Sequence, residues 1–349
     1  MRGSIWRGSI WIGLTLAFTA CRQTVVFDQS GFDAAGGDAG ADAGADGGQT
    51  VCTGPPAQIV PEYPEMIVAL DRSVGMNGRF GDATELMAAR DALDVQAARY
   101  QKAIHLGYVE FPSSSSSSCP QGECCAGILS SPNPNFLKFN TALHTCDLNQ
   151  SCASTSYSRP TWPALTSTLS WFNQREPIHR YVLLITNGQP DCGGGSGFGG
   201  CQDTESVVSQ LAGLDVTTYV VVPAPPPLDS GVANCMTMLA LAGNAPTPQP
   251  YYQWAMDPAA LSSVVGDIAR DVATDACQID VLQIQAAIDP DRGSVQWMNT
   301  PIPRSRNGGD GWDIANNGFD VKLRGQWCDR LIQDGPEAFT VFPVCSPKH

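Results

Sequence analysis

"MIVALDRSVGM", residues 66–76, contains a run of five apolar residues that ends at Asp71 and continues into small and polar residues. An apolar run without alternation is typical of a strand that is buried on both faces of a parallel sheet. Asp71 and Ser73 then stand just beyond the carboxyl end of that strand. Ligands of open α/β sheets bind at these strand ends. The stretch therefore predicts both a class of fold and the place of a functional site.

The segments around it alternate between two patterns. Short runs rich in aliphatic residues predict strands at 65–71, 103–111, 180–186 and 216–223. Apolar residues at helical spacing predict helices at 82–102, 161–173, 203–213, 232–243 and 258–274. This alternation predicts a doubly wound, mainly parallel α/β sheet over residues 56–275. Asn187, which follows the third of these strands, should then lie at the same sheet edge as Asp71.

From Cys277 onward the pattern changes to short alternating segments separated by turn residues, with "NNG" at 316–318 as a hairpin signal. Residues 276–349 are therefore predicted to form a small β domain. Cys277, Cys328 and Cys345 are its disulfide candidates, because a core of this size usually needs cross-links.

The first 20 residues have the layout of a secretory signal peptide, with arginines before a short apolar run and small residues before Cys21. They are similar to a bacterial lipoprotein signal, in which Cys21 becomes the acylated first residue. The alternative is an ordinary cleaved signal that removes Cys21. Residues 21–55 are rich in Gly, Ala and Asp, and are expected to form a disordered tether.

These features predict an exported protein that is held at the membrane by a lipid. Arg22 stands where an aspartate commonly retains lipoproteins in the inner membrane, so the outer membrane is expected. Which face of that membrane the tether hangs from stays open.

Cysteine usage agrees with export. Without Cys21, 12 of the 13 cysteines remain, an even number that suits disulfides in an oxidising compartment. Cys146 with Cys152 and Cys192 with Cys201 are closely spaced candidates, and the latter pair would close a small glycine-rich loop. Zinc is the competing explanation, but the sequence has no paired CxxC and only four scattered histidines.

Charge and motifs exclude several classes of function. The net charge of -14 argues against nucleic acid, which binds basic surfaces. "GSGFGG" at 195–200 fits a dinucleotide fingerprint, but the next predicted strand ends in proline without an acidic residue. The sequence has neither a GxSxG nor an HExxH motif. The chain is therefore expected not to be an enzyme.

Three segments in this order, "LDRSVGM", "SRPTWPAL" and "LLITNGQPD", resemble a von Willebrand factor A (vWA) domain. More narrowly, the chain resembles the cysteine-rich vWA lipoproteins of myxobacteria. The resemblance covers roughly residues 60–275. It implies a metal-ion-dependent adhesion site, in which Mg²⁺ is held by a DxSxS loop, a threonine of a second loop and an aspartate after a later strand. A carboxylate of the partner completes the metal's shell.

The resemblance places Asp71 and Ser73 at the first two ligand positions, but the other positions differ. Gly75 stands at the second serine, Arg159 at the threonine and Asn187 at the aspartate. Because Mg²⁺ demands near-ideal oxygen geometry, this set should bind it poorly, and no bound cofactor is expected. Two arrangements remain open: the Arg159 guanidinium pairs with Asp71 in the metal's place, or it points to solvent.

The sequence thus predicts a lipid-anchored vWA protein that binds an extracellular or periplasmic protein without a working metal site. The contacts are expected from Arg159, Thr161 and Asp191 together with the cysteine-rich insertion at 113–158, near the carboxyl edge of the sheet. One alternative is Mg²⁺-dependent adhesion through Asp71 and Ser73, completed by Asp191 or a partner carboxylate. The other is a structural envelope component that binds through its C-terminal β domain.

Overall fold

The structure is a computed structural model that describes residues 50–51, 56, 63–113, 125–145, 157–175, 179–191, 200–245, 251–280, 288, 291–315, 320–342 and 346–347. The predicted signal peptide, Cys21 and most of the predicted tether lie outside these ranges, as do Cys146, Cys152, Cys192 and Cys345. Two compact units are present. In the smaller one, β1 (Thr50–Val51) pairs antiparallel with β16 (Ser346–Pro347). Gly54–Cys345 form the larger one.

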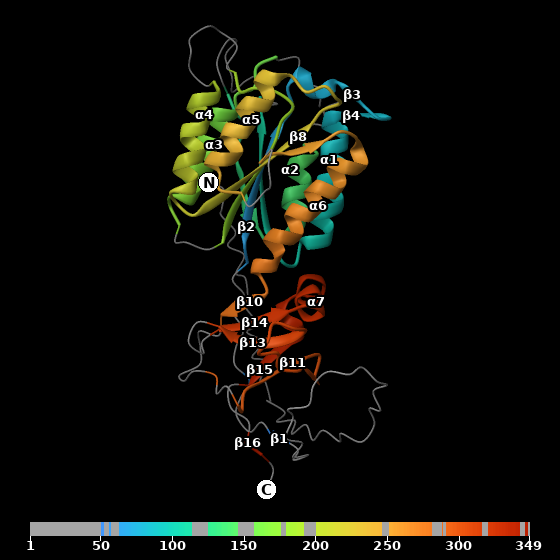
Figure 1. Cartoon of the computed structure of the whole chain (residues 1–349), viewed down its shortest axis with the longest axis vertical. Helices are drawn as coiled ribbons and strands as arrows, with labels where there is room; N and C mark the ends of the chain where they lie inside the picture. The colour runs from blue at the N-terminus through green and yellow to red at the C-terminus, as the bar shows by residue number, and fades with distance from the viewer. Residues whose placement is uncertain are drawn as a thin grey trace, which may run out of the picture. The chain divides into compact units, whose positions relative to one another are not determined.

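A six-stranded sheet with the order β6-β5-β2-β7-β8-β9 is the centre of the larger unit (Figure 1). Its strands are β2 (Glu65–Asp71), β5 (His105–Phe111), β6 (Ser130–Asn133), β7 (Arg180–Ile185), β8 (Val216–Pro223) and β9 (Gln253–Ala255). Only β6, at one edge, runs antiparallel to its neighbour. β2, the strand that contains the apolar run, lies in the interior of the sheet and is buried along its whole length.

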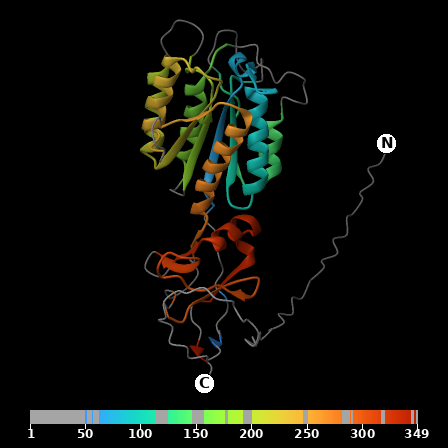
Figure 2. The same ribbon diagram turned by 45° about the vertical axis from the view of Figure 1, so that its right-hand side comes forward.

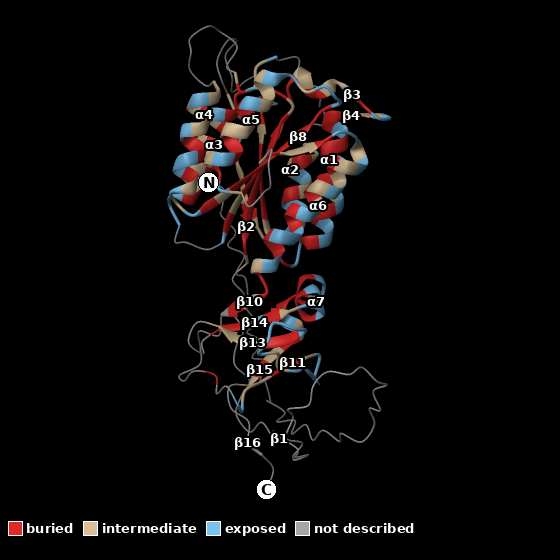
Figure 3. Cartoon of the chain, viewed as in Figure 1, coloured by how far each residue is buried: buried red, intermediate tan, exposed pale blue. Residues whose placement is uncertain are grey.

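Helices cover both faces of this sheet (Figure 1 and Figure 2). On one face lie α1 (Glu85–Tyr100), α2 (Phe136–Leu143) and α6 (Pro258–Asp275), and on the other α3 (Thr161–Phe172), α4 (Cys201–Ala212) and α5 (Ser230–Ala242). Alternate residues of β2 enter the two cores: Val68 and Leu70 pack towards α1, while Ile67 and Ala69 pack towards α3. Buried residues accordingly follow the sheet and the inner faces of the helices (Figure 3). The predicted doubly wound α/β fold is confirmed.

The insertion contains regular structure that was not predicted. β6 extends the sheet, and α2 buries Phe139 and Leu143 against the face that also carries α1. Arg90 of α1 donates from Nε to the carbonyl oxygen of Leu143, 3.1 Å away, at the end of α2. Residues 130–143 are therefore part of the domain core, and the prediction that the insertion lies near the carboxyl edge of the sheet is wrong for them. A helix of 8 residues offers too few apolar positions to stand out from its polar surroundings.

The C-terminal part contains two three-stranded sheets, β10-β14-β13 and β12-β11-β15. Their strands are β10 (Gln278–Asp280), β11 (Ser294–Trp297), β12 (Thr300–Pro301), β13 (Gly311–Ala315), β14 (Asp320–Arg324) and β15 (Phe339–Phe342). β13 pairs antiparallel with β14, as the predicted hairpin requires. Helix α7 (Gln326–Asp334) was not predicted, and buries Trp327 and Leu331. The small β region at the C-terminus is confirmed, whereas a domain boundary at residue 276 stays a prediction.

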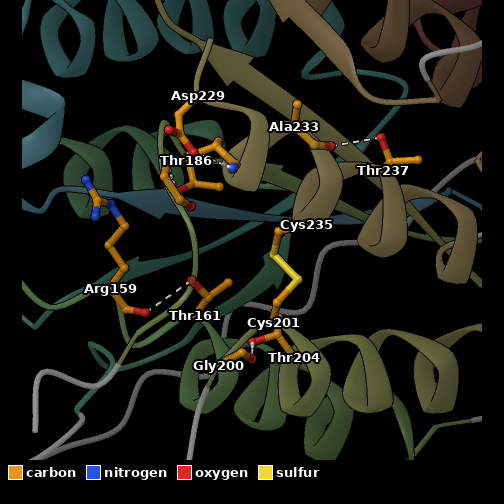
Figure 4. The surroundings of a disulfide bond; sticks show 12 residues. Arg159, Thr161, Thr186, Gly200, Cys201, Thr204, Asp229, Ala233, Cys235 and Thr237 are labelled. Atoms are coloured by element: carbon orange, nitrogen blue, oxygen red, sulfur yellow. Dashed lines mark hydrogen bonds between the residues drawn. A yellow bond between two sulfur atoms is a disulfide. The ribbon is translucent and has the colours of Figure 1, made fainter. Parts of the chain in front are cut away.

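Two disulfides are described, Cys201–Cys235 and Cys277–Cys328. The second joins the residue just before β10 to α7, and uses two of the three predicted cysteines. The first corrects the predicted loop closure, because Cys201 at the start of α4 pairs with Cys235 of α5 and is therefore unavailable to Cys192 (Figure 4). Neighbouring helices on one face of the sheet bring these sulfurs together, which spacing along the chain does not reveal. In the part of the chain that the structure describes, no helix is long and apolar enough to cross a membrane.

Candidate functional site

Asp71 is the last residue of β2 and its carboxylate is fully buried. Oδ1 accepts a hydrogen bond of 2.7 Å from the backbone N–H of Ser73. Oδ2 accepts one of 2.7 Å from the hydroxyl of Thr186. Leu70 lies opposite Ile185 in the parallel register, so Thr186, the next residue, falls beside Asp71. The carboxyl ends of β2 and β7 therefore meet at one edge of the sheet, as predicted.

Arg159 lies directly on this buried carboxylate. Its Nε is 3.3 Å from Oδ2 of Asp71, and its Nη2 donates a hydrogen bond of 3.2 Å to Oδ1 of Asn187. The Arg159 side chain is 20% exposed, so its guanidinium is largely withdrawn from water. Of the two arrangements left open by the sequence, the structure has the ion pair with Asp71.

Two glycines leave the space that the guanidinium fills. A Cβ atom at Gly75 would lie 2.1 Å from Nη2 of Arg159, and one at Gly188 would lie 2.5 Å from its Cζ. Both distances are far below van der Waals contact, so a side chain at either position would require the guanidinium to move. Gly75, which the resemblance places at the second serine, is thus sterically coupled to Arg159, which the resemblance places at the threonine.

Asn187 connects the guanidinium to a second carboxylate. Its Nδ2 donates to Oε2 of Glu85, the first residue of α1, while its Oδ1 accepts from Arg159. An amide carries a donor at one end and an acceptor at the other, and both are used here. An aspartate at this position would place a second carboxylate against Glu85. Asparagine is therefore the residue type that fits between a carboxylate and a guanidinium.

The loops that carry Arg159 and Asp191 are joined through their backbones. The N–H of Arg159 donates to the carbonyl of Asp191 over 2.9 Å, and the N–H of Asp191 donates back over 3.0 Å. Thr161 begins α3 fully buried, and its hydroxyl donates to the carbonyl of Arg159 over 3.3 Å (Figure 4). The hydroxyl of Thr161 is thus used to shape the loop. Figure 4 also shows the guanidinium of Arg159 extending away from the Cys201–Cys235 disulfide.

Burial governs the ionisation of both carboxyl groups. It raises the pKa of Asp71, while the hydrogen bonds from the Ser73 N–H and Thr186 and the charge of Arg159 act in the opposite direction. Burial also raises the pKa of Glu85 to about 7, with Asp71 adding to the rise and Asn187 and Arg159 opposing it. Both groups are therefore less acidic than in water.

Replacing Glu85 by glutamine should flatten part of the dependence of stability on pH. Because the pKa of Glu85 in the folded chain is about 7 and its ordinary value is 4.5, the folded state holds a proton between these pH values that the unfolded state releases. Stability should therefore fall as pH rises from about 4.5 to about 7, by roughly 2 kcal/mol from this group once the shift is discounted for solvent screening. Urea unfolding at pH 5, 6, 7 and 8 measures this, and equal pH profiles of the two proteins would contradict it.

The structure brings together most of the residues proposed from the sequence: Asp71, Ser73, Arg159, Asn187 and Asp191. Two others were missed. Thr186 could have been found, because it stands directly before Asn187 at the end of a predicted strand. Glu85 had no such signal, since only the path of the loop after β2 brings the start of α1 to Asn187.

Within the described ranges, no group of three or more His, Cys, Asp and Glu side chains is arranged to hold a metal ion. The hydroxyl groups of Ser73 and Thr186 lie next to the Asp71 carboxylate, and the Arg159 guanidinium lies between that carboxylate and the amide oxygen of Asn187. These donors do not make the compact oxygen shell that Mg²⁺ requires.

Comparison with known proteins gave distant structural similarities only. No family model matches the chain, and no curated protein matches it. Among solved structures, the pilus adhesin SpaC of Lactobacillus rhamnosus GG aligns with 78% of this chain and 38% of its own length, with a TM-score of 0.48 and 12% identity. Thus the chain corresponds to well under half of that adhesin.

Two further structures are similar at a comparable level. Proximal thread matrix protein 1 from the mussel byssus, with a zinc-occupied MIDAS motif, aligns over 61% of this chain and 46% of its own, with a TM-score of 0.43 and 14% identity. Manganese-loaded TRAP protein of Plasmodium vivax aligns over 61% of this chain and 76% of its own, with a TM-score of 0.41 and 13% identity. Because all these scores are below 0.5, function must be inferred from the site itself.

Proposed function

We propose that this chain binds another macromolecule through the loops at the carboxyl edge of its parallel sheet, without a bound metal ion and without catalysis. The observation that carries the proposal is the 3.3 Å contact between Nε of Arg159 and the buried carboxylate of Asp71. A Mg²⁺ ion would need several oxygen ligands about 2.1 Å away, in the space that the guanidinium fills. The permanent charge of arginine instead neutralises Asp71.

The rigidity of the loops supports a role in recognition. Paired backbone hydrogen bonds join Arg159 to Asp191, and the Thr161 hydroxyl fixes the turn between them and α3. A surface that is ordered before binding loses less conformational entropy when the partner arrives. The ion pair between Arg159 and Asp71 adds to this order, because it ties the loop of Arg159 to the end of β2.

The residue types around Arg159 suit a protein partner. Tyr157 is 78% exposed two residues before it, and Trp162 is 39% exposed in the first turn of α3. Tyrosine, tryptophan and arginine are the residue types that carry most binding energy in protein interfaces. Three of them lie within six residues, in the segment that enters α3, which makes this edge of the sheet the preferred contact surface.

The disulfides support an oxidising compartment, and hence an exported protein. We extend this to a lipid anchor at Cys21 in the outer membrane, with a partner that is an extracellular or periplasmic protein. The anchor predicts that substitution of Cys21 by serine releases the protein from the membrane fraction. An unchanged membrane fraction would remove this part of the proposal.

Two other functions stay as alternatives. Metal-dependent adhesion would need Arg159 to leave Asp71 and a metal ion to bind Asp71 and Ser73. An envelope component that binds through its C-terminal β region would use a different surface, and Met298, between β11 and β12, is 59% exposed there. The three possibilities differ in the surface used and in the need for a metal ion.

Site-specific photocrosslinking in the native cell envelope separates these functions. A photoreactive phenylalanine derivative replaces Trp162 in one variant and Met298 in the other, since both positions are exposed and apolar. We expect a discrete crosslinked partner from position 162 and none from position 298. The same product should form in EDTA and in Mg²⁺.

The other outcomes are equally informative. Crosslinks from position 298 alone would favour the structural component and contradict the proposal. Crosslinks from position 162 that disappear in EDTA would favour metal-dependent adhesion. A substitution of Tyr157 by alanine should weaken the crosslink at 162 if this edge forms the interface.

A further inference from the structure

The guanidinium of Arg159 contacts Asp71 and Asn187 along only one of its edges. Nε faces the buried carboxylate of Asp71 at 3.3 Å and Nη2 donates to the Asn187 amide oxygen, so these two nitrogens are turned towards the interior. Among the described residues, Nη1 has only a contact of 3.9 Å with Oδ2 of Asp191, which is too long for a hydrogen bond. A guanidinium has five N–H groups in a planar fork, so its outer edge retains donors.

Asp191 stands beside this outer edge without binding it closely. Its carboxylate is 49% exposed, in contrast to the fully buried carboxylate of Asp71. Its main chain is fixed by the two backbone hydrogen bonds to Arg159. The side chain of Asp191 can therefore rotate away while the loop stays where it is. Asp191 has the chemistry and the position of an internal ligand that another carboxylate can replace.

We propose that the outer edge of Arg159 receives a carboxylate side chain of a protein partner, and that Asp191 is an internal competitor which this carboxylate displaces. The inference rests on the proposed function, because it names the group that the loop edge recognises. It also assigns a role to Asp191 that differs from a metal ligand or a direct partner contact.

The charge around the site favours a single carboxylate over a phosphate. Arg159 is surrounded by Asp71, Glu85 and Asp191, and the whole chain carries a net charge of -14. A phosphate would bring nearly two negative charges into these surroundings. A carboxylate brings one, and its two oxygens match the fork of a guanidinium. Exposed Tyr157, before Arg159, and Trp162, in the first turn of α3, would contact apolar parts of the protein that presents this carboxylate.

Titration with acetate, the simplest carboxylate probe, tests this inference on the full chain. The resonance of the Arg159 Nε–H group is followed by NMR at pH 7.5, with chloride replaced by acetate at constant ionic strength. We expect a saturable shift, and about threefold tighter acetate binding in Asp191→Asn, since one exposed charge at this distance is worth up to about 1 kcal/mol. Asp267→Asn, an exposed change of the same charge on α6, is the matched control and should bind as the unchanged chain does.

Arg159→Lys completes the design, because lysine keeps the positive charge beside Asp71 but has no planar fork. In this variant, acetate should cause no saturable shift of the backbone amide resonances around residue 159. Equal acetate affinity of Asp191→Asn and Asp267→Asn would overturn the competitor role. Acetate binding that persists in Arg159→Lys would overturn the carboxylate site. Crosslinking from position 162 judges the proposed function separately, so a failed acetate titration would leave that function standing.

Discussion

Replacement of Arg159 by methionine should lower the free energy of unfolding by about 3 kcal/mol, because it leaves the buried carboxylate of Asp71 without its positive partner. Methionine keeps most of the side-chain volume between Gly75 and Gly188. The loss of stability therefore comes from the missing charge more than from a cavity. Urea unfolding at pH 7 measures the change. The presence or absence of Mg²⁺ should make no difference to either protein.

Asp71→Asn provides the control. Alone, Asp71→Asn should lower the free energy of unfolding less than Arg159→Met does, since the remaining guanidinium is partly exposed and can reach water. Combined with Arg159→Met, it should restore most of the lost stability, because no unpaired charge then remains buried. Additive losses in the double variant would show that the two side chains are not coupled, and would contradict the ion pair.

The triple variant Gly75→Ser, Arg159→Thr, Asn187→Asp should gain micromolar binding of Mn²⁺, measured by isothermal titration, whereas the unchanged chain should show none up to millimolar metal. These changes restore the residue types of the metal site that the sequence resembles. Arg159→Thr also removes the guanidinium, which a side chain at position 75 would otherwise meet. Binding should disappear when Asp71→Ala is added, because the first carboxylate is then lost.

Glu85 should weaken Mn²⁺ binding by the triple variant, and this effect can be measured. It accepts a hydrogen bond from Asn187, so an aspartate at 187 faces a second carboxylate. Glu85→Gln in the triple background should therefore strengthen Mn²⁺ binding. A folded triple variant that binds no metal with either residue at 85 would show that the correspondence of Arg159 and Asn187 to metal ligands is wrong.

The sequence predicted the central fold well, because the pattern of its strands is strong. Buried parallel strands read as continuous apolar runs, and "MIVAL" at 66–70 is one of them. Since parallel strands end at one edge, Asp71 and Asn187 could be placed together without knowledge of the structure. The Arg159–Asp71 pair could be raised as one of two arrangements, but the choice depends on space left by Gly75 and Gly188.

The features that were missed depend on contacts between distant segments. Cys235 lies inside a helix with no spacing that relates it to Cys201, and only the packing of α4 beside α5 pairs them. Helices α2 and α7 are short, and their stability comes from the surfaces they cover. Glu85 reaches Asn187 because the turn after β2 returns the chain to the same edge. None of these relations has a local signature.

The most direct test of the central claim is a crystal structure determined from crystals grown with MnCl₂, with anomalous diffraction used to locate manganese. The account predicts Nε of Arg159 in contact with the Asp71 carboxylate and no anomalous peak at the carboxyl end of β2. A manganese peak bound by Asp71 and Ser73, with Arg159 turned out to solvent, would contradict it.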